Sequence, residues 1–348
     1  MTVVSTGEKD NRGVTNGFDH STYLPSNDMR VFQVPDEILF GGTWEVPKTT
    51  CLLGTRSHAL NDYRRLQFLH SVSAPLLLPE VNCISKLLIR RKDFPNINLF
   101  SLTIMMHSLT CLESVHIERW SYGNVIYEGA YERCFMSSFN LPQSVKDFSF
   151  YQDNNTLYYH RLVGANHVVE TMMSGLLSKV AEMAENIAIS HAYEAKVIFK
   201  HPYAWRFKKL KTLALTSVVL AVCDEHAVNS LLCRVAKAAK EIPKLETLEI
   251  WGYKTLYQVP PYDKITSVAI FTYKRLDQFN SCISWKSNSS FKMSEETQAH
   301  WNDVADGQDA NVSLKYLELD PNVSSIGAIH NHLALMDRIL HNTSWAQV

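Results

Sequence analysis

The chain has 348 residues, of which 46% are hydrophobic and 20% are charged, a composition typical of a folded globular protein that excludes a largely disordered chain. Lys and Arg number 34 and Asp and Glu number 35, so the formal net charge of −1 gives no electrostatic reason to expect a nucleic acid or an anionic membrane as partner. We find no apolar run long enough to span a bilayer, and residues 1–28 lack the apolar stretch of a signal peptide.

The cysteines favour a reducing compartment. There are seven of them, none in a C-x-x-C pair, and several lie within apolar runs. Buried unpaired thiols are the simplest interpretation of this distribution. We therefore expect a cytoplasmic protein.

The beginning of the chain differs in composition from the rest. Residues 1–45 are rich in small polar residues and in Pro and Gly, which predicts a disordered or irregular N-terminal arm. Residues 46–348 are expected to form a single domain. Its first element is predicted to be a capping helix over Arg56–Val72, where apolar residues recur at helical spacing.

An apolar pattern of the form L-x-x-L-x-L recurs along this domain. In a strand, alternate side chains point to opposite faces, so its apolar residues are expected to face a core and the residues between them to face outward. The pattern occurs at Ile84-Leu87-Ile89, Leu112-Val115-Ile117, Val145-Phe148-Phe150, Ala184-Ile187-Ile189, Leu210-Leu213-Leu215, Leu245-Leu248-Ile250, Ile265-Val268-Ile270 and Leu314-Leu317-Leu319.

These repeats predict an α/β fold. One unit cannot bury its own apolar face, so neighbouring units must stack. We expect an irregular leucine-rich-repeat-like solenoid, with about eight parallel strands on the concave face and helices on the convex face. The alternative is an ordinary α/β sheet of unrelated strands.

Amphipathic stretches between the strands predict the helices. Ala165–Met183 and Asp224–Ile242 each carry one apolar stripe, which indicates a helix packed on the core. Ser294–Ala305 begins with a capping Ser followed by two acidic residues, as helix N-termini prefer. Ser325–Asn342 is expected to close the far end of the solenoid.

One further signal lies in Leu210–Ser217, Val228–Leu232 and Ala238–Trp251, with more at 192–195, 283–286 and 301–305. In these stretches the chain resembles a fungal family of uncharacterised F-box/leucine-rich-repeat-like proteins. The resemblance implies a repeat fold and an N-terminal F-box that docks a ubiquitin-ligase scaffold. Val34–Leu39 resembles the start of an F-box, but Phe40–Trp44 breaks the helix that follows, so the F-box is predicted to be missing.

Motifs for nucleotide binding, metal binding and nucleophilic catalysis were not found in the sequence. His330 and His332 are two residues apart, and such residues do not face together on a helix. We therefore expect no cofactor and no metal.

The candidate site is the centre of the concave face, where the middle repeats carry small residues between aromatic ones. Small side chains leave volume there, and aromatic rings supply apolar walls. The predicted catalytic groups are His116 and Glu249. A histidine side chain ordinarily titrates near neutrality and can act as a general acid or base. A buried carboxyl such as that of Glu249 can stay protonated and donate a hydrogen bond. The predicted substrate-binding residues are Ser149, Tyr151, Ala188, Ser190, His191, Ala214, Thr216, Trp251, Tyr253, Phe271 and Tyr273.

Three functions remain open from the sequence. The first is a pocket for an apolar small-molecule substrate, as in a cofactor-independent cyclase or cycloaddition (Diels-Alderase-like) enzyme of fungal secondary metabolism. Holding a substrate in a reactive pose needs no cofactor. The second is a protein-recognition module, a common use of a solenoid face. The third is an F-box-derived ubiquitin-ligase substrate adaptor. Inserted loops that fill the hollow would remove the pocket.

Overall fold

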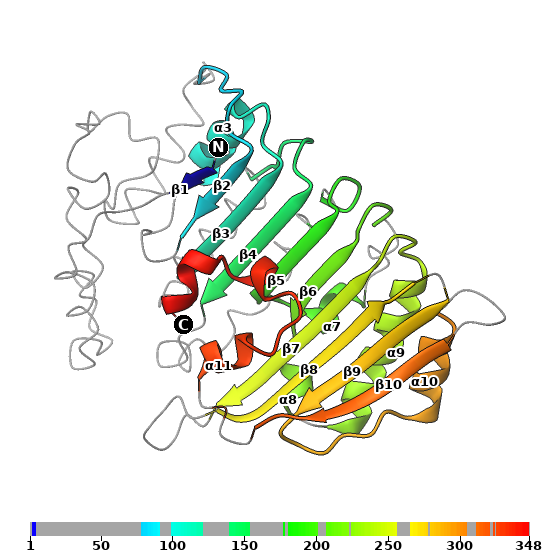
Figure 1. Cartoon of the computed structure of the whole chain (residues 1–348). Helices are drawn as coiled ribbons and strands as arrows, with labels where there is room; N and C mark the ends of the chain where they lie inside the picture. Colours follow the sequence, from blue (N-terminus) through cyan, green and yellow to red (C-terminus); the bar gives the residue numbers. More distant parts are fainter. Residues whose placement is uncertain are drawn as a thin grey trace, which may run out of the picture.

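The structure is a computed structural model of the whole chain (Figure 1). It describes residues 2–4, 78–90, 99–120, 139–153, 177, 180–200, 207–222, 224–255, 265–277, 279–304, 311–320, 323 and 325–347. The predicted helix over Arg56–Val72, the F-box-like stretch Val34–Leu39 and most of the helix predicted over Ala165–Met183 lie outside these residues. Within the arm predicted for residues 1–45, Thr2–Val4 forms a strand.

One open, mixed sheet of ten strands organises the described residues, and the strands follow one another in sequence order. The strands are β1 (Thr2–Val4), β2 (Lys86–Ile89), β3 (Ser114–Trp120), β4 (Asp147–Asp153), β5 (Asn186–Glu194), β6 (Thr212–Thr216), β7 (Thr247–Thr255), β8 (Ile265–Arg275), β9 (Asn280–Ser287) and β10 (Asn311–Glu318). Neighbours are parallel except for the pairs β7–β8 and β8–β9, which are antiparallel.

The strands predicted from β2 to β7 are confirmed, and they begin in equivalent ways. At each step one backbone carbonyl accepts two N–H groups of the next strand, as Glu185 O does from Lys211 and Thr212. The apolar residues of the pattern, such as Leu213 and Leu215, lie in one large core with the helices. This regular stacking explains why the pattern was readable from β2 to β7.

The prediction of an all-parallel sheet was wrong at β8. Nine residues separate Thr255 from Ile265, whereas a parallel connection needs a crossover of about a dozen residues or more. The chain therefore turns back, and Ile250 pairs with Phe271 while Trp251 pairs with Ile270. This reversal exchanges the two faces that were predicted for β8.

Strand β9 was not predicted, and it lies in the long interval between the predicted strands that begin at Ile265 and Leu314. Its Ser281, Ile283, Trp285 and Ser287 are buried in alternation, and two of these four are serines, so the apolar pattern was too weak to find it. The following strand β10 lies at an edge of the sheet. Leu317, predicted to be buried there, is 45% exposed.

The described helices are short except for two. They are α3 (Leu99–Ser108), α7 (Ala195–Ile198), α8 (Val218–Val222), α9 (Glu225–Lys240), α10 (Glu295–Asn302), α11 (Ile326–His330) and α12 (Met336–Ile339), with a final 3-10 turn at Asn342–Gln347. As predicted, α9 buries its apolar stripe, and Asp224 caps it by accepting from the N–H groups of His226 and Ala227. Among the described residues, no helix is long and apolar enough to cross a membrane.

The two faces of the sheet are covered differently (Figure 1). We call the side that carries α8, α9 and α10 the helix face, and the opposite side, predicted to be concave, the front face. Residues 325–347, the C-terminal segment, cross the front face, and α12 contacts β4 and β5. The prediction that Ser325–Asn342 closes the far end was therefore wrong, because the segment packs over the middle of the sheet.

Candidate functional site

The small residues predicted to form a floor lie side by side on the front face. Ser149 of β4 pairs with Ala188 of β5, which pairs with Ala214 of β6, and Ala214 pairs with Glu249 of β7. His116 of β3 continues this row on the other side. The strand register therefore brings both predicted catalytic groups to the ends of one row of small residues.

Aromatic and imidazole rings gather beside this row. The His191 ring lies 4.9 Å from the Trp251 ring and 5.6 Å from each of the Tyr151 and Tyr253 rings, all edge to face. His330 of α11 approaches the same group, 5.2 Å from Trp251. We call these five side chains the ring cluster. Four of them were predicted site residues, and His330 arrives with the C-terminal segment.

A backbone irregularity in β5 directs the side chain of His191 toward the other rings of the ring cluster. Its φ is 61°, the left-handed region that few residues other than Gly occupy. The register between β5 and β6 is interrupted here, so that Glu194 rather than Ser190 pairs with Thr216. The backbone N–H of His191 donates to Oγ1 of Thr216 at 2.8 Å, which holds the irregular turn in place. Thr216 thus supports the backbone beside the ring cluster, while the assignment of Ser190 and Thr216 as substrate-binding residues stays a prediction.

Phe271 and Tyr273 do not belong to this site, which corrects the prediction for both. Because β8 is antiparallel, their side chains lie in the core of the helix face. Their rings lie 5.0 Å and 5.2 Å from the ring of Trp301 in α10. Val268 and Ile270 of β8 occupy the front face in their place.

The C-terminal segment covers the floor. Ala188, Ala214 and Trp251 form one buried apolar cluster with side chains of the segment. The members that the segment contributes are Ile329, Leu333, Leu335, Ile339 and Leu340. The small residues of the sheet therefore make room for the chain's own apolar side chains. The sequence had suggested inserted loops as a possible filling, and the C-terminal segment takes that place instead.

Glu249 binds the backbone of the segment. Its two carboxylate oxygens accept from the N–H groups of Ala334 and Leu335 at 2.8 and 2.9 Å, and Thr272 Oγ1 donates at 3.1 Å. Burial raises the pKa of this carboxyl, and these three hydrogen bonds and the Lys286 charge offset part of that rise.

Glu118 forms a second attachment point. Its Oε1 accepts from the N–H of His341 at 3.3 Å and lies 3.2 Å from Nε2 of His116. Burial acts to raise the pKa of Glu118, but the hydrogen bond and the charge of His116, together with Ser344 and His341, lower it overall. Burial and the nearby charge of His116 lower the pKa of His341.

Two cations of the sheet bind carbonyl groups of the same segment. Lys286 Nζ donates to the carbonyl of His332 at 2.9 Å, and Arg90 donates to the carbonyl of Thr343 at 2.8 Å. The front face thus holds the segment largely through main-chain groups. The assignment of His116 and Glu249 as catalytic groups stays a prediction.

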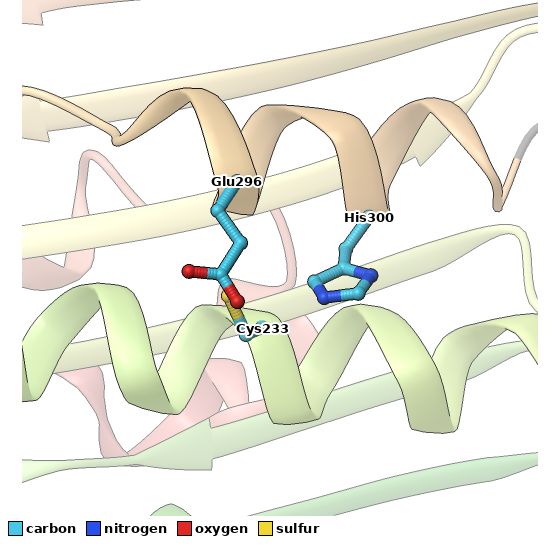
Figure 2. A group of neighbouring side chains, drawn as sticks. All are labelled: Cys233, Glu296 and His300. Atoms are coloured by element: carbon cyan, nitrogen blue, oxygen red, sulfur yellow. The ribbon is translucent and has the colours of Figure 1, made fainter.

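A separate group of side chains on the helix face was missed from the sequence. Cys233 of α9 and Glu296 and His300 of α10 bring one ligand-type atom each within 4.8 Å of one another (Figure 2). Glu296 and His300 are four residues apart on a helix, which is a readable signal. Cys233 is remote in the sequence, and only the packing of α9 on α10 brings it to them.

The family assignment rests on one comparison. Residues 140–341, more than half of the chain, match the family described as "Family of unknown function (DUF6546)". The match spans β4 to α12, and so includes both the floor and most of the segment that covers it. The resemblance to F-box/leucine-rich-repeat-like proteins stays a prediction. Comparison with curated proteins and with solved structures gave no match. The chain therefore belongs to the DUF6546 family.

Proposed function

We propose that the protein is a recognition module, built on a leucine-rich-repeat-like scaffold, whose front face binds a segment of polypeptide. The C-terminal segment is the occupant of that face in the present structure. The observation that supports this most strongly is the pair of buried carboxylates, Glu118 and Glu249, that accept backbone N–H groups of the segment. Main-chain hydrogen bonds also supply affinity where an extended peptide adds to the edge of a sheet.

The cost of burying the Glu249 carboxyl favours a face that binds the backbone of a peptide. Glu249 has no exposed surface, and a buried carboxyl is costly unless hydrogen bonds satisfy its oxygens. An occupant that offers two adjacent N–H groups meets this need whatever its side chains are. Lys286 and Arg90 bind backbone carbonyls in the same way. Another polypeptide with suitable apolar residues can therefore replace the segment.

Specificity comes from the apolar anchors. The small side chains of Ala188 and Ala214 leave space that large aliphatic residues of the occupant fill. Ile339 and Leu340 fill it in the present structure, each at most 1% exposed. We propose that a partner presents aliphatic side chains at equivalent spacing.

The test is to separate the segment from the sheet after folding. A protease site inserted after Pro321 allows the folded full chain to be cut, and a labelled peptide with the sequence of residues 323–348 is then added. The cut segment is expected to stay bound and to exchange with the labelled peptide in a saturable way. Unfolding of the sheet when the segment leaves would show that the segment is an integral part of the fold, and would refute the proposal.

A matched pair of variants sharpens this test. Glu249→Gln replaces one of the two accepting oxygens with an NH2 group, which cannot accept from an N–H of the segment, and is expected to speed the release of the cut segment. Glu318→Gln changes an exposed carboxyl of β10 and is expected to leave the release rate unchanged. Equal release rates in the two variants would contradict the role given to Glu249.

A second candidate function is the binding of an apolar small molecule beneath the segment, as in a cofactor-independent cyclase of fungal secondary metabolism. Ser149 Oγ, Ser190 Oγ and Trp251 Nε1 are buried and have no hydrogen-bond partner among the described residues. Buried polar groups normally have partners, and a ligand with one polar atom would supply one. This observation supports the second candidate, while the coverage of the floor supports the first.

Ala214→Trp tests the second candidate, because it fills the floor without changing a polar group. Binding or turnover of an apolar molecule that co-purifies with the full chain is expected to be lost, while circular dichroism still reports a folded protein. Lys254→Trp, at an exposed position of β7, is the control for an added indole. Unchanged binding in a folded Ala214→Trp protein would place the ligand elsewhere.

A further inference from the structure

The three side chains Cys233, Glu296 and His300 meet between two helices of the helix face, on the opposite side of the sheet from the C-terminal segment (Figure 2). They present a thiol sulfur, a carboxylate oxygen and an imidazole nitrogen within 4.8 Å of one another. Cys233 and His300 are half-buried, and Glu296 is exposed. The group is therefore open to an ion from solvent.

The packing of α9 against α10 fixes the relative positions of these ligands. Glu296 and His300 are four residues apart, so they share one face of α10. The start of α10 is held by Ser294, whose side chain caps Thr297 N–H and whose own N–H donates to Oδ1 of Asn229 in α9 at 2.8 Å. The helix that carries two ligands is thus tied directly to the helix that carries the third.

We infer that Cys233, Glu296 and His300 form a binding site for Zn²⁺. Sulfur, nitrogen and oxygen are the ligand atoms that zinc takes in proteins, and sites with three protein ligands keep a fourth position for water. The exposed Glu296 side chain is the ligand with most freedom to adjust its position to a bound ion. On binding, the thiol of Cys233 loses its proton to solvent, and the resulting thiolate coordinates the metal.

Thr297 is placed to support the thiolate. Its Oγ1 lies 3.1 Å from Sγ of Cys233, 2.8 Å from Oγ of Ser294 and 3.5 Å from the carbonyl of Asn229. With a neutral thiol, Thr297 can donate to the Asn229 carbonyl. With a thiolate, it can turn its O–H to the sulfur and accept from Ser294. Thr297 is therefore a positioning residue, since it acts on the metal through Cys233.

The test is a titration of the chelator-treated full chain with Co²⁺, a spectroscopic substitute for zinc. Wild type is expected to bind Co²⁺ with a thiolate-to-cobalt charge-transfer band and to lose the band when Zn²⁺ is added. Zinc is also expected to raise the temperature of thermal unfolding. Absence of the band in wild type would overturn the inference.

Variants separate this site from the other cysteines and histidines. Cys233→Ser is expected to abolish the band, and Glu296→Gln and His300→Gln to weaken Co²⁺ binding. Thr297→Val is expected to weaken it by about 10- to 100-fold, as loss of a hydrogen bond to a metal ligand does. Cys282→Ser in β9 and His226→Gln in α9 are the controls and are expected to bind as wild type does.

Two results would contradict the site. A band that persists in Cys233→Ser would assign the metal to another cysteine. Binding unchanged in Glu296→Gln would remove the carboxylate from the site, and because Glu296 is exposed, that variant is expected to fold normally. The site lies apart from the front face, so these outcomes do not depend on the proposed recognition of a polypeptide.

Discussion

Glu118 and Glu249 are both fully buried carboxyls that bind the same segment, yet their surroundings shift the pKa in opposite directions. Glu118 has His116 beside it, and His116 together with Ser344 and the N–H of His341 outweighs the cost of burial. Glu249 has hydrogen-bond donors and a more distant Lys286, and burial prevails there. The adjacent imidazole of His116 is thus the largest of the interactions that lower the pKa of Glu118.

This difference predicts opposite effects of pH on stability. Because the folded pKa of Glu118 is lowered, its contribution to stability is present above the unfolded value of 4.5 and is lost as pH falls through the folded value. Because the folded pKa of Glu249 is raised, its contribution is present below 4.5 and is lost as pH rises through the folded value.

Urea unfolding of wild type, Glu118→Gln and Glu249→Gln over a pH series measures both effects. The stability of wild type relative to Glu118→Gln is expected to rise with pH below 4.5 and to level off above it. The stability of wild type relative to Glu249→Gln is expected to fall with pH above 4.5. Slopes of the same sign for both variants would contradict the assigned environments.

At the scale of the elements, Gly252 of β7 shows how closely α8 packs on the sheet. A Cβ atom at this position would lie 2.0 Å from the backbone carbonyl oxygen of Ser217, which precedes α8. The atoms that the added Cβ would meet belong to the backbone of Ser217, which cannot move aside as the end of a flexible side chain can. We expect Gly252→Ala to lower the free energy of unfolding by about 1–3 kcal/mol, as other overpacked sites do. Lys254→Ala, at an exposed position of the same strand, is the control and is expected to change it little.

The repeat pattern makes a second prediction for the strands. Leu213 of β6 is 1% exposed in the core of the helix face, and Leu317 of the edge strand β10 is 45% exposed. Leu213→Ala is expected to destabilise the protein by about 2–5 kcal/mol as a buried truncation. Leu317→Ala is expected to cost less than about 0.5 kcal/mol. Chemical denaturation that gives equal losses would contradict the register of β10.

The strands that follow the repeated apolar pattern could be predicted from the sequence. The prediction failed at β8 and β9, where the connections between strands make the neighbours antiparallel. From β2 to β7, the alternation of apolar residues within the repeated pattern defines both register and face, as Ala188 and Ala214 illustrate. The short interval before Ile265 was the available sign of the reversal, but a local apolar pattern is the same in either strand direction. Phe271 and Tyr273 were therefore assigned to the wrong face.

At the scale of the whole molecule, the sheet lies between the helices on one face and the C-terminal segment on the other. The helices form one core with the apolar pattern residues, and the C-terminal segment forms a second core with the residues between them. The candidate site could be predicted as a set of neighbours on one face, since strand register is local information. Its coverage could not, because contacts such as that of Glu118 with His341 join residues 223 apart in the chain.

The central claim is that the segment lies on the front face and is held there by Glu249. Hydrogen–deuterium exchange of the backbone N–H groups of Ala334 and Leu335 tests it most directly, because these are the groups that Glu249 binds. We expect slow exchange in wild type and faster exchange in Glu249→Gln, with the amides of β6 unchanged between the two proteins. Fast exchange of both N–H groups in wild type, at the rate of an exposed chain, would contradict the account and leave the front face open.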